Sequence, residues 1–159
     1  MSPAVKPIPE GMHTVTPHLV INGAAKAIDF YKRAFGAQEL GRFPTPDGRV
    51  MHAAIKIGDS HVFLADEFPD MGSKAPKTGE HPPVQVHLYV EDADRVFNQA
   101  ISAGAKATMP MQNMFWGDRY GQLTDPFGHC WSVATRIENV TPEEMKKRAE
   151  AMFSQPAAR

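Results

Sequence analysis

The chain has 159 residues, of which 42% are hydrophobic and 22% charged, and its formal net charge is −1. This size suits one domain or two small halves that share a core, and the near-neutral charge excludes a broad basic surface for nucleic acid or an anionic membrane. There is no apolar run long enough to span a bilayer, no signal-peptide core and only one cysteine, Cys130, so we expect a cytoplasmic protein without an internal disulfide.

The first half of the chain predicts a β-α-β-β-β module. Residues 14–22 form a strand rich in β-branched residues, and the next segment has apolar residues at helical spacing. We expect Asn22 to cap this helix and Gly36 to end it. The predicted elements are a strand over 14–22, a helix over 24–35, and strands over 38–43, 49–57 and 60–66.

The second half predicts the same order of elements, followed by one more helix. Thr141-Pro142-Glu143-Glu144 is typical of a helix start, with Thr141 as the cap and Glu144 completing a capping box. The predicted elements are a strand over 84–90, a helix over 92–103, strands over 106–109, 121–124 and 130–136, and a C-terminal helix from 142.

The two modules repeat at a fixed distance. His18-Leu19-Val20-Ile21 returns as His87-Leu88-Tyr89-Val90, and the two histidines are 69 residues apart. A repeat of this length predicts two copies of one structural unit. We therefore expect an arm over 1–13, a domain over 14–137 with halves 14–67 and 84–137 joined by a linker over 68–83, and a helix and tail over 138–159.

Tandem modules with a histidine on each first strand resemble the vicinal oxygen chelate superfamily, which includes glyoxalase I, extradiol dioxygenases and bleomycin-resistance proteins. The closer resemblance is to its PhnB-like branch. It is carried by Thr16-Pro17-His18-Leu19, Phe30-Tyr31-Lys32-Arg33-Ala34-Phe35-Gly36, His52-Ala53, Trp116-Gly117-Asp118-Arg119-Tyr120-Gly121, Asp125-Pro126-Phe127-Gly128-His129-Cys130-Trp131 and Thr141-Pro142-Glu143-Glu144-Met145. The resemblance implies an α+β fold of paired βαβββ modules, a ligand cavity on the concave sheet faces, and a homodimer.

The resemblance also implies where a divalent metal (Zn, Ni, Mn or Fe) would bind. His18 and His87 match the histidine ligand positions of the family, whose remaining ligands are usually carboxylates on the last strand of a half. Those positions hold Phe63 and Ser132, neither of which is a carboxylate. Catalytic metals normally keep about three protein ligands, so this set is short.

Three nearby residues are considered as substitutes. His52 is a plausible cavity residue on a neighbouring strand, and Glu67 has the parity of Phe63 but follows the end of its strand. Strand alternation places Asp66 on the opposite face from Phe63. His52 and Glu67 therefore stay open as ligands, against the alternative of local hydrogen bonding.

Trp116 and Arg119 lie in an unusual cluster flanked by glycines. An indole and a guanidinium there would suit a planar or anionic ligand. The structural alternative is a tight turn in which Asp118 pairs with Arg119 or caps local backbone.

Two functions follow. The first is a metal-independent protein that binds a small molecule in a cavity lined by Trp116, Arg119, His52, Phe63 and Ser132. The second is a metal-dependent lyase, isomerase or dioxygenase that uses His18 and His87, with His52 or Glu67 completing the set.

Overall fold

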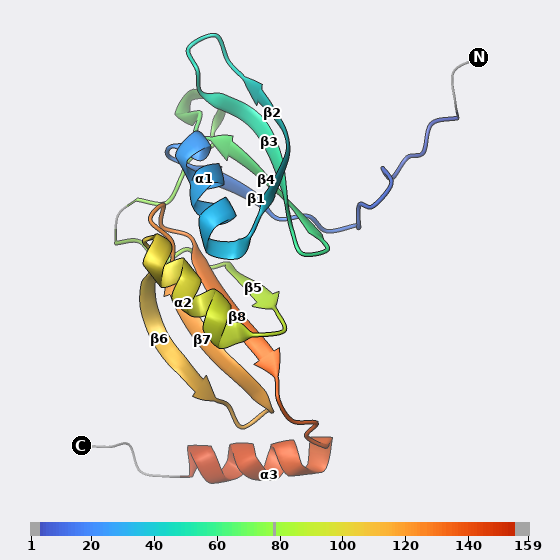
Figure 1. The fold of residues 1–159 in the computed structure, drawn as a ribbon, viewed down its shortest axis with the longest axis vertical. Helices are drawn as coiled ribbons and strands as arrows, with labels where there is room; N and C mark the ends of the chain where they lie inside the picture. Colours follow the sequence, from blue (N-terminus) through green and yellow to red (C-terminus); the bar gives the residue numbers. More distant parts are fainter. Residues whose placement is uncertain (1–3, 78, 155–159) are drawn as a thin grey trace. The chain divides into compact units, whose positions relative to one another are not determined.

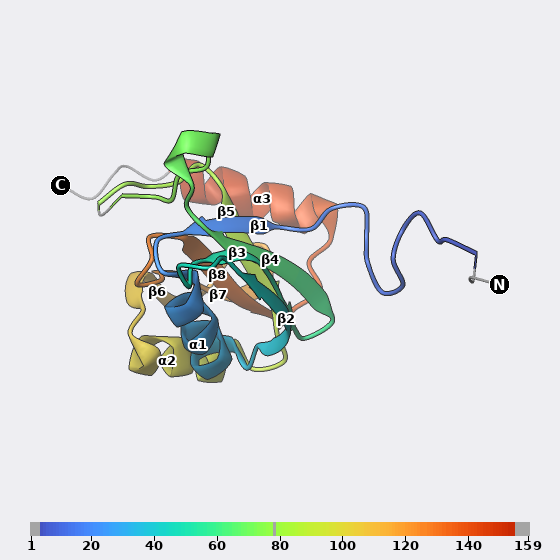
Figure 2. The same cartoon turned by 90° about the horizontal axis from the view of Figure 1, so that it is seen from above.

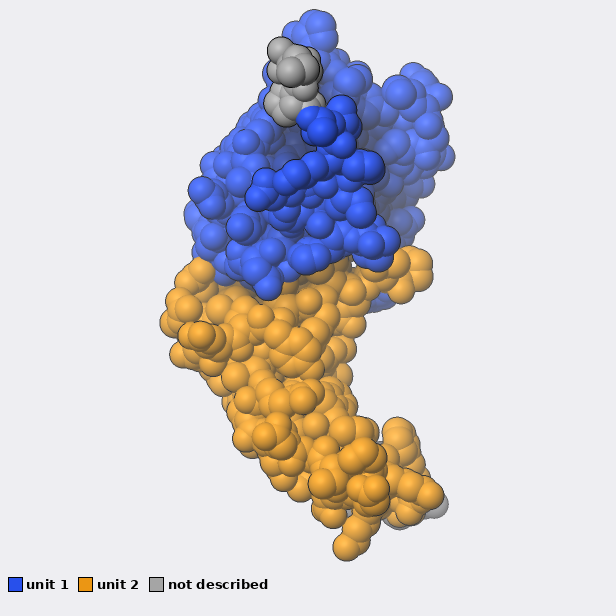
Figure 3. Space-filling view, turned by 90° about the vertical axis from the view of Figure 1, so that its right-hand side faces the viewer, with its two compact units in different colours: residues 1–81 blue, residues 82–159 orange. Residues whose placement is uncertain are grey.

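The computed structural model describes residues 4–77 and 79–154 of the chain. It divides into two units, Met1–His81 and Pro82–Arg159, which Figure 3 shows in different colours. Each unit contains a four-stranded sheet with a helix packed on one face (Figures 1 and 2). The expected α+β fold of two βαβββ modules and a C-terminal helix is confirmed.

Unit 1 has the strand order β1-β4-β3-β2, in which β1 runs parallel to β4 and the other neighbours are antiparallel. Its elements are β1 (His18–Ile21), α1 (Ala24–Phe35), β2 (Gln38–Pro44), β3 (Val50–Ile57), β4 (Ser60–Asp66) and a short 3₁₀ turn, η1 (Pro69–Met71).

Unit 2 repeats this arrangement in the order β5-β8-β7-β6, again with the first pair parallel. Its elements are β5 (Gln85–Tyr89), α2 (Ala93–Ala103), β6 (Lys106–Asn113), β7 (Asp118–Thr124), β8 (Cys130–Arg136) and α3 (Pro142–Phe153). In the register of the parallel pairs, His18 lies opposite Phe63 and His87 opposite Ser132, so the two histidines occupy equivalent positions, as the repeat predicts.

Strand alternation divides each sheet into two faces. The face under the helix is apolar and buried: in unit 1 it includes Leu19, Ile55 and Leu64, and in unit 2 Leu123 and Trp131. We call the other side the helix-free face. It carries the histidines.

Two strands are longer than the sequence pattern indicated. β6 continues beyond Met109 to Asn113, and β7 begins at Asp118 rather than Gly121. Pro110 would normally argue against a strand, but β6 is an edge strand and its pairing is irregular between Met109 and Gln112. A missing backbone N–H is tolerated at such a place.

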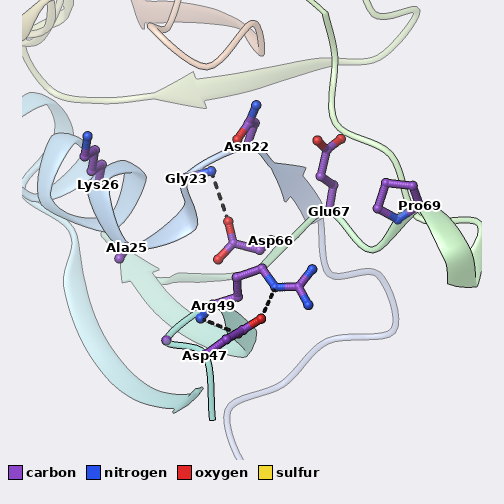
Figure 4. Close-up of a pocket in the computed structure, with 10 residues that line it drawn as sticks. Asn22, Gly23, Ala25, Lys26, Asp47, Arg49, Asp66, Glu67 and Pro69 are labelled. Atoms are coloured by element: carbon purple, nitrogen blue, oxygen red, sulfur yellow. Dashed lines mark hydrogen bonds and ion pairs between the residues drawn. The ribbon is translucent and has the colours of Figure 1, made fainter. Parts of the chain in front are cut away.

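The expected capping of α1 by Asn22 is wrong. The helix is preceded by Gly23, which has no side-chain cap, and the carboxylate of Asp66 takes that role from the end of β4. One oxygen of Asp66 accepts from the backbone N–H groups of Gly23 and Ala24, both at 3.0 Å, and the other accepts from Val50 at 2.7 Å. Figure 4 shows Asp66 beside the start of the helix. A buried carboxylate is suited to this position because it satisfies free N–H groups at the positive end of a helix.

Unit 2 uses Thr135 in the same way. Its hydroxyl accepts from the Ala93 N–H at 2.8 Å and donates to the Val90 carbonyl at 2.7 Å. Thr135 stands 69 residues after Asp66, so the link between the last strand and the helix start belongs to the repeat. Asp92 adds a local cap by accepting from the Arg95 N–H.

Helix α3 begins as predicted at Pro142, with the Thr141 side chain accepting from the Glu144 N–H. The reciprocal half of the expected capping box is not formed, because the Glu144 carboxylate accepts from Arg148 instead. Arg148 also binds Glu138 and the Phe115 carbonyl, which joins α3 to the turn before β7. In the part of the chain that the structure describes, no helix is long and apolar enough to cross a membrane.

Replacing Asp66 tests the link that the sequence did not reveal. We expect Asp66→Ala to lower the free energy of unfolding by about 3 to 5 kcal/mol, because three backbone N–H groups lose a charged acceptor. Chemical denaturation followed by circular dichroism measures this. The exposed Asp59→Ala is the control and should change stability by less than about 0.5 kcal/mol; equal losses in the two variants would contradict the assigned role.

Candidate functional site

The helix-free face of unit 1 carries three rings in contact. The rings of His52 and Phe63 have centroids 4.8 Å apart, and His18 lies 6.1 Å from His52 and 6.3 Å from Phe63. All three pairs are edge-to-face, an arrangement that aromatic quadrupoles favour. The structure thus brings together three of the residues that the sequence singled out, from β1, β3 and β4.

The two imidazoles affect one another. The pKa of His18 is lowered from its ordinary value, first by desolvation and second by the neighbouring His52. Both effects disfavour the protonated form of the His18 ring. At neutral pH His18 is therefore an uncharged imidazole, the form that can accept a hydrogen bond or bind a metal.

The helix-free face of unit 2 carries four rings. His87 contacts Tyr89 edge-to-face with centroids 4.6 Å apart, and it lies nearly parallel to Tyr120 at 5.9 Å and 21°. Trp116 meets Tyr120 edge-to-face at 5.5 Å. We call these four residues, His87, Tyr89, Trp116 and Tyr120, the ring cluster.

Asp118 lies beneath this cluster at the start of β7. One carboxylate oxygen accepts from the Tyr89 hydroxyl at 2.6 Å and from the Trp116 indole N–H at 3.0 Å. Its other oxygen is 3.6 Å from Nε of Arg136, an ion-pair distance rather than a hydrogen bond. The alternative in which Asp118 pairs with Arg119 is not what the structure shows.

Ser132 and Gln122 complete the polar contacts of this face. Ser132, which is buried, lies 2.6 Å from Nδ1 of His87. The Gln122 amide donates to the Tyr120 hydroxyl at 2.9 Å. The pKa of His87 is lowered chiefly by desolvation, against an opposing effect of Asp118, so its ring is also uncharged at neutral pH.

The two helix-free faces are built from equivalent positions with different side chains. Phe63 pairs with Ala54, and its counterpart Ser132 pairs with Gln122. On β3, His52 lies two residues before Ala54, and on β7, Tyr120 lies two residues before Gln122. Unit 1 therefore places an imidazole where unit 2 places a phenol, and it has no acceptor at the position of Ser132.

Arg119 lies on the other face of β7. Its guanidinium makes hydrogen bonds of 3.0 to 3.3 Å to the carboxylate of Asp94 on α2 and one of 3.2 Å to Asn113. A ligand on the helix-free face would meet Arg119 only if these contacts were broken. Its role in ligand binding remains a prediction.

Trp116 is positioned by a tight turn before β7. Gly117 has φ +101°, and a Cβ at this position would come within 2.4 Å of the Glu138 carbonyl oxygen. The backbone N–H groups of Ile137 and Glu138 donate to the Gly117 carbonyl, so the end of β8 holds the turn. Only glycine allows this close approach.

The metal-ligand candidates are not gathered into one set within a unit. Glu67 accepts from the Ala75 N–H at 3.0 Å and so fixes the segment after β4. Among residues 4–77 and 79–154, no group of three or more His, Cys, Asp or Glu side chains is arranged to hold an ion. Phe63 and Ser132 occupy the last-strand positions opposite His18 and His87, and a phenyl ring cannot ligate.

An open pocket of about 570 Å³ lies at the start of α1 (Figure 4). Asp66 is committed there to capping the helix, and the carboxylate of Asp47 accepts from Nε of Arg49 at 3.0 Å. Asp47 and Arg49 are thus paired, while Asp66 and Glu67 accept from backbone N–H groups, and we assign the pocket a structural role.

Sequence reasoning missed Tyr89 and Gln122 and assigned Asp118 only local structural roles. Strand alternation was the available signal: Tyr89 is two residues after His87, and Asp118, Tyr120 and Gln122 alternate along β7.

The fold and the equivalent histidines define a class of proteins built from paired βαβββ modules, and comparison with known proteins names it. Residues 11–133 match the model of the Glyoxalase/Bleomycin resistance protein/Dioxygenase superfamily. The chain belongs to this superfamily, in agreement with the resemblance in its sequence.

Relatives and solved structures agree with this assignment. An uncharacterized protein of Mycobacterium bovis is 45% identical over 144 residues, which cover 89% of this chain and 93% of that protein. The crystal structure of TioX from Micromonospora sp. ML1 is similar with a TM-score of 0.63 and 27% identity, covering 79% of this chain and 100% of that one. A structure from Arabidopsis thaliana has a TM-score of 0.62 and 25% identity, covering 77% and 98%.

The coupling between the two histidines of unit 1 predicts a measurable change. We expect His52→Phe to raise the pKa of His18, because the Coulombic effect of the second imidazole is removed while a ring of similar size remains. His52→Ala should raise it further, since desolvation also falls. Titration of the imidazole signals by NMR measures both; a His18 pKa that is the same in wild type and both variants would contradict the coupling.

Proposed function

We propose that this protein binds a small organic molecule against the helix-free faces of its sheets, without a tightly held metal ion. The observation that carries the proposal is the pairing of each first-strand histidine with a residue that is not a carboxylate, Phe63 in unit 1 and Ser132 in unit 2. Both faces present rings, which suit an organic ligand better than an ion.

The residues proposed to form the ligand site are His52 and Phe63 in unit 1, and Trp116 with Ser132 in unit 2. His52 and Phe63 present ring edges and faces beside His18. Ser132 acts through its contact with His87 rather than directly, because its own side chain is buried. Arg119 would join the ligand only by leaving Asp94.

The alternative function is a metal-dependent lyase, isomerase or dioxygenase. It is favoured by the equivalent positions of His18 and His87 and by the 6.1 Å between the ring centroids of His18 and His52. Uncharged imidazoles are suitable ligands for Zn, Ni, Mn or Fe. The alternative requires a further ligand, for which Glu67 would have to release the Ala75 N–H.

We also place the chain in the PhnB-like branch, on the motifs from Trp116 to Gly121 and from Asp125 to Trp131. One protein of similar fold, from Bacillus cereus, is described as a PhnB protein. A homodimer in the cytoplasm, with no nucleic-acid or membrane partner, belongs to the same proposal; edge strands at both sides of each sheet supply surfaces that a second copy could cover.

A metal titration separates the two functions. We expect protein purified without a histidine tag to contain clearly less than one Zn, Ni, Mn or Fe ion per chain, because a site without its carboxylates holds an ion weakly. Elemental analysis and titration calorimetry measure this. One tightly held ion per chain, lost in His18→Ala and in His87→Ala but kept in the exposed His13→Ala, would overturn the proposal in favour of the enzyme.

A fragment screen tests small-molecule binding itself. With ¹⁵N-labelled protein, we expect bound fragments to shift amide signals on the helix-free strand positions and to leave α1 and α2 unchanged. Trp116→Ala should weaken such fragments by about tenfold or more through loss of its ring. A screen in which no fragment shifts either helix-free face would contradict the proposal.

A further inference from the structure

Asp118 is a buried carboxylate, and its removal from water costs free energy that the βαβββ fold does not require. Its side chain is 1% exposed, and one of its oxygens has no hydrogen-bond partner. Removing a carboxylate from water is unfavourable unless its partners compensate. Its close partners are two side chains of the ring cluster, Tyr89 and Trp116, together with the exposed Arg136 at 3.6 Å.

The repeat shows that the module does not need this arrangement. Unit 1 has Val20 where unit 2 has Tyr89, two residues after the first-strand histidine. It has Val50, two residues before His52, where unit 2 has Asp118, two residues before Tyr120. The same βαβββ module therefore forms with neither the carboxylate nor the phenol.

We propose that Asp118 is a positioning residue that fixes Tyr89 and Trp116 so that the ring cluster of unit 2 binds a planar aromatic ligand by stacking. This inference rests on the proposed small-molecule binding and names the ligand class for one of the two faces.

The first argument is the orientation of the rings. Tyr89 is 59% exposed, and besides its contact with the His87 ring its position is held by the 2.6 Å hydrogen bond from its hydroxyl to Asp118. The same carboxylate oxygen accepts from Trp116, which meets Tyr120 edge-to-face. One buried oxygen therefore fixes two of the four rings, and preorganised rings lose less entropy when a ligand binds.

The second argument is the shortage of free polar atoms. The donors of Tyr89 and Trp116 are directed to Asp118. The Gln122 amide donates to Tyr120, and Nδ1 of His87 lies 2.6 Å from Ser132. What remains for a ligand is ring surface together with Nε2 of His87, the Tyr120 O–H and Oε1 of Gln122. The ring surface favours offset stacking with another planar ring.

The third argument is charge. Desolvation lowers the pKa of His87, so its imidazole is uncharged at neutral pH, and Arg136, the guanidinium beside the cluster, lies 3.6 Å from the carboxylate of Asp118, which balances its charge. Arg119, the guanidinium nearest in sequence, is held by Asp94 on the other face of β7. The face is therefore suited to an uncharged planar ligand rather than to a carboxylate or a phosphonate.

A matched pair of probes tests this inference. The planar compound is 2-naphthol, and its saturated counterpart decahydro-2-naphthol has the same carbon skeleton and hydroxyl without the π system. The protein has two tryptophans, so two indole N–H signals report by NMR. We expect 2-naphthol to shift the Trp116 signal and to leave that of Trp131, which is fully buried, unchanged. The saturated probe should bind about three- to tenfold more weakly.

Variants then separate positioning from folding. Tyr89→Phe keeps the ring but loses the bond to Asp118, and Asp118→Ala releases both rings; in each, the preference for 2-naphthol over the saturated probe should fall toward one. Asp118→Asn keeps a carbonyl oxygen that can accept both bonds and should retain the preference. Glu143→Ala, which removes an exposed carboxylate of unit 2 on α3, is the matched control and should retain it too.

The outcomes are distinct from failure of the proposed function. Equal affinity for the two probes, or an unchanged preference in Tyr89→Phe and Asp118→Ala, would overturn the inference. A 2-naphthol site whose shifts lie only around His18 and His52 would also overturn it, while leaving small-molecule binding intact. If Asp118→Ala weakened the binding of both probes by the same factor, the role of Asp118 would be purely structural and its positioning role would be rejected.

Discussion

In the part of the chain that the structure describes, one helix packs on one face of each sheet, and the placement of the candidate site residues on the strands follows from that constraint. One helix packs on each four-stranded sheet, so alternate residues along a strand must be apolar and the others are free to vary. Leu64 and Leu123 lie under the helices, whereas Phe63 and Gln122 lie opposite them. The helix-free faces can therefore change chemistry without loss of the core.

A hydrogen-bonded link from the last strand to the start of the helix, from β4 to α1 and from β8 to α2, holds each helix on its face of the sheet. Asp66 in unit 1 and Thr135 in unit 2 hold the first N–H groups of α1 and α2. Both side chains point to the helix side of their strands. They set the position of each helix relative to its sheet, and they remove Asp66 from the carboxylates available to a metal.

The two faces show how a duplicated module acquires different chemistry. His18 and His87 are retained at equivalent positions, but His52 is replaced by Tyr120 and Phe63 by Ser132. Unit 1 thus has two coupled imidazoles beside a phenyl ring, while unit 2 has one imidazole within a ring cluster that rests on a buried carboxylate. Membership of the superfamily rests on residues 11–133, whereas the side chains that the two faces present differ at these few positions.

The sequence by itself determined the module and its repeat. Periodicity and glycine stops predict α1 from Ala24 to Phe35 and β4 from Ser60 to Asp66 with the observed bounds, and the 69-residue spacing places His18 and His87 at matching positions. These features are local or strictly periodic, so a single chain reveals them. Alternation also placed Asp66 away from Phe63.

Only the tertiary structure decided which side chains meet. The cap of α1 comes from Asp66, 42 residues beyond Ala24, rather than from the adjacent Asn22. Tyr89 and Trp116 converge on Asp118 from different strands and a turn, and Arg119 turns to Asp94 on α2. Such contacts depend on strand register and on the packing of a helix on a sheet, and both are set by distant parts of the chain rather than by the local pattern of residues.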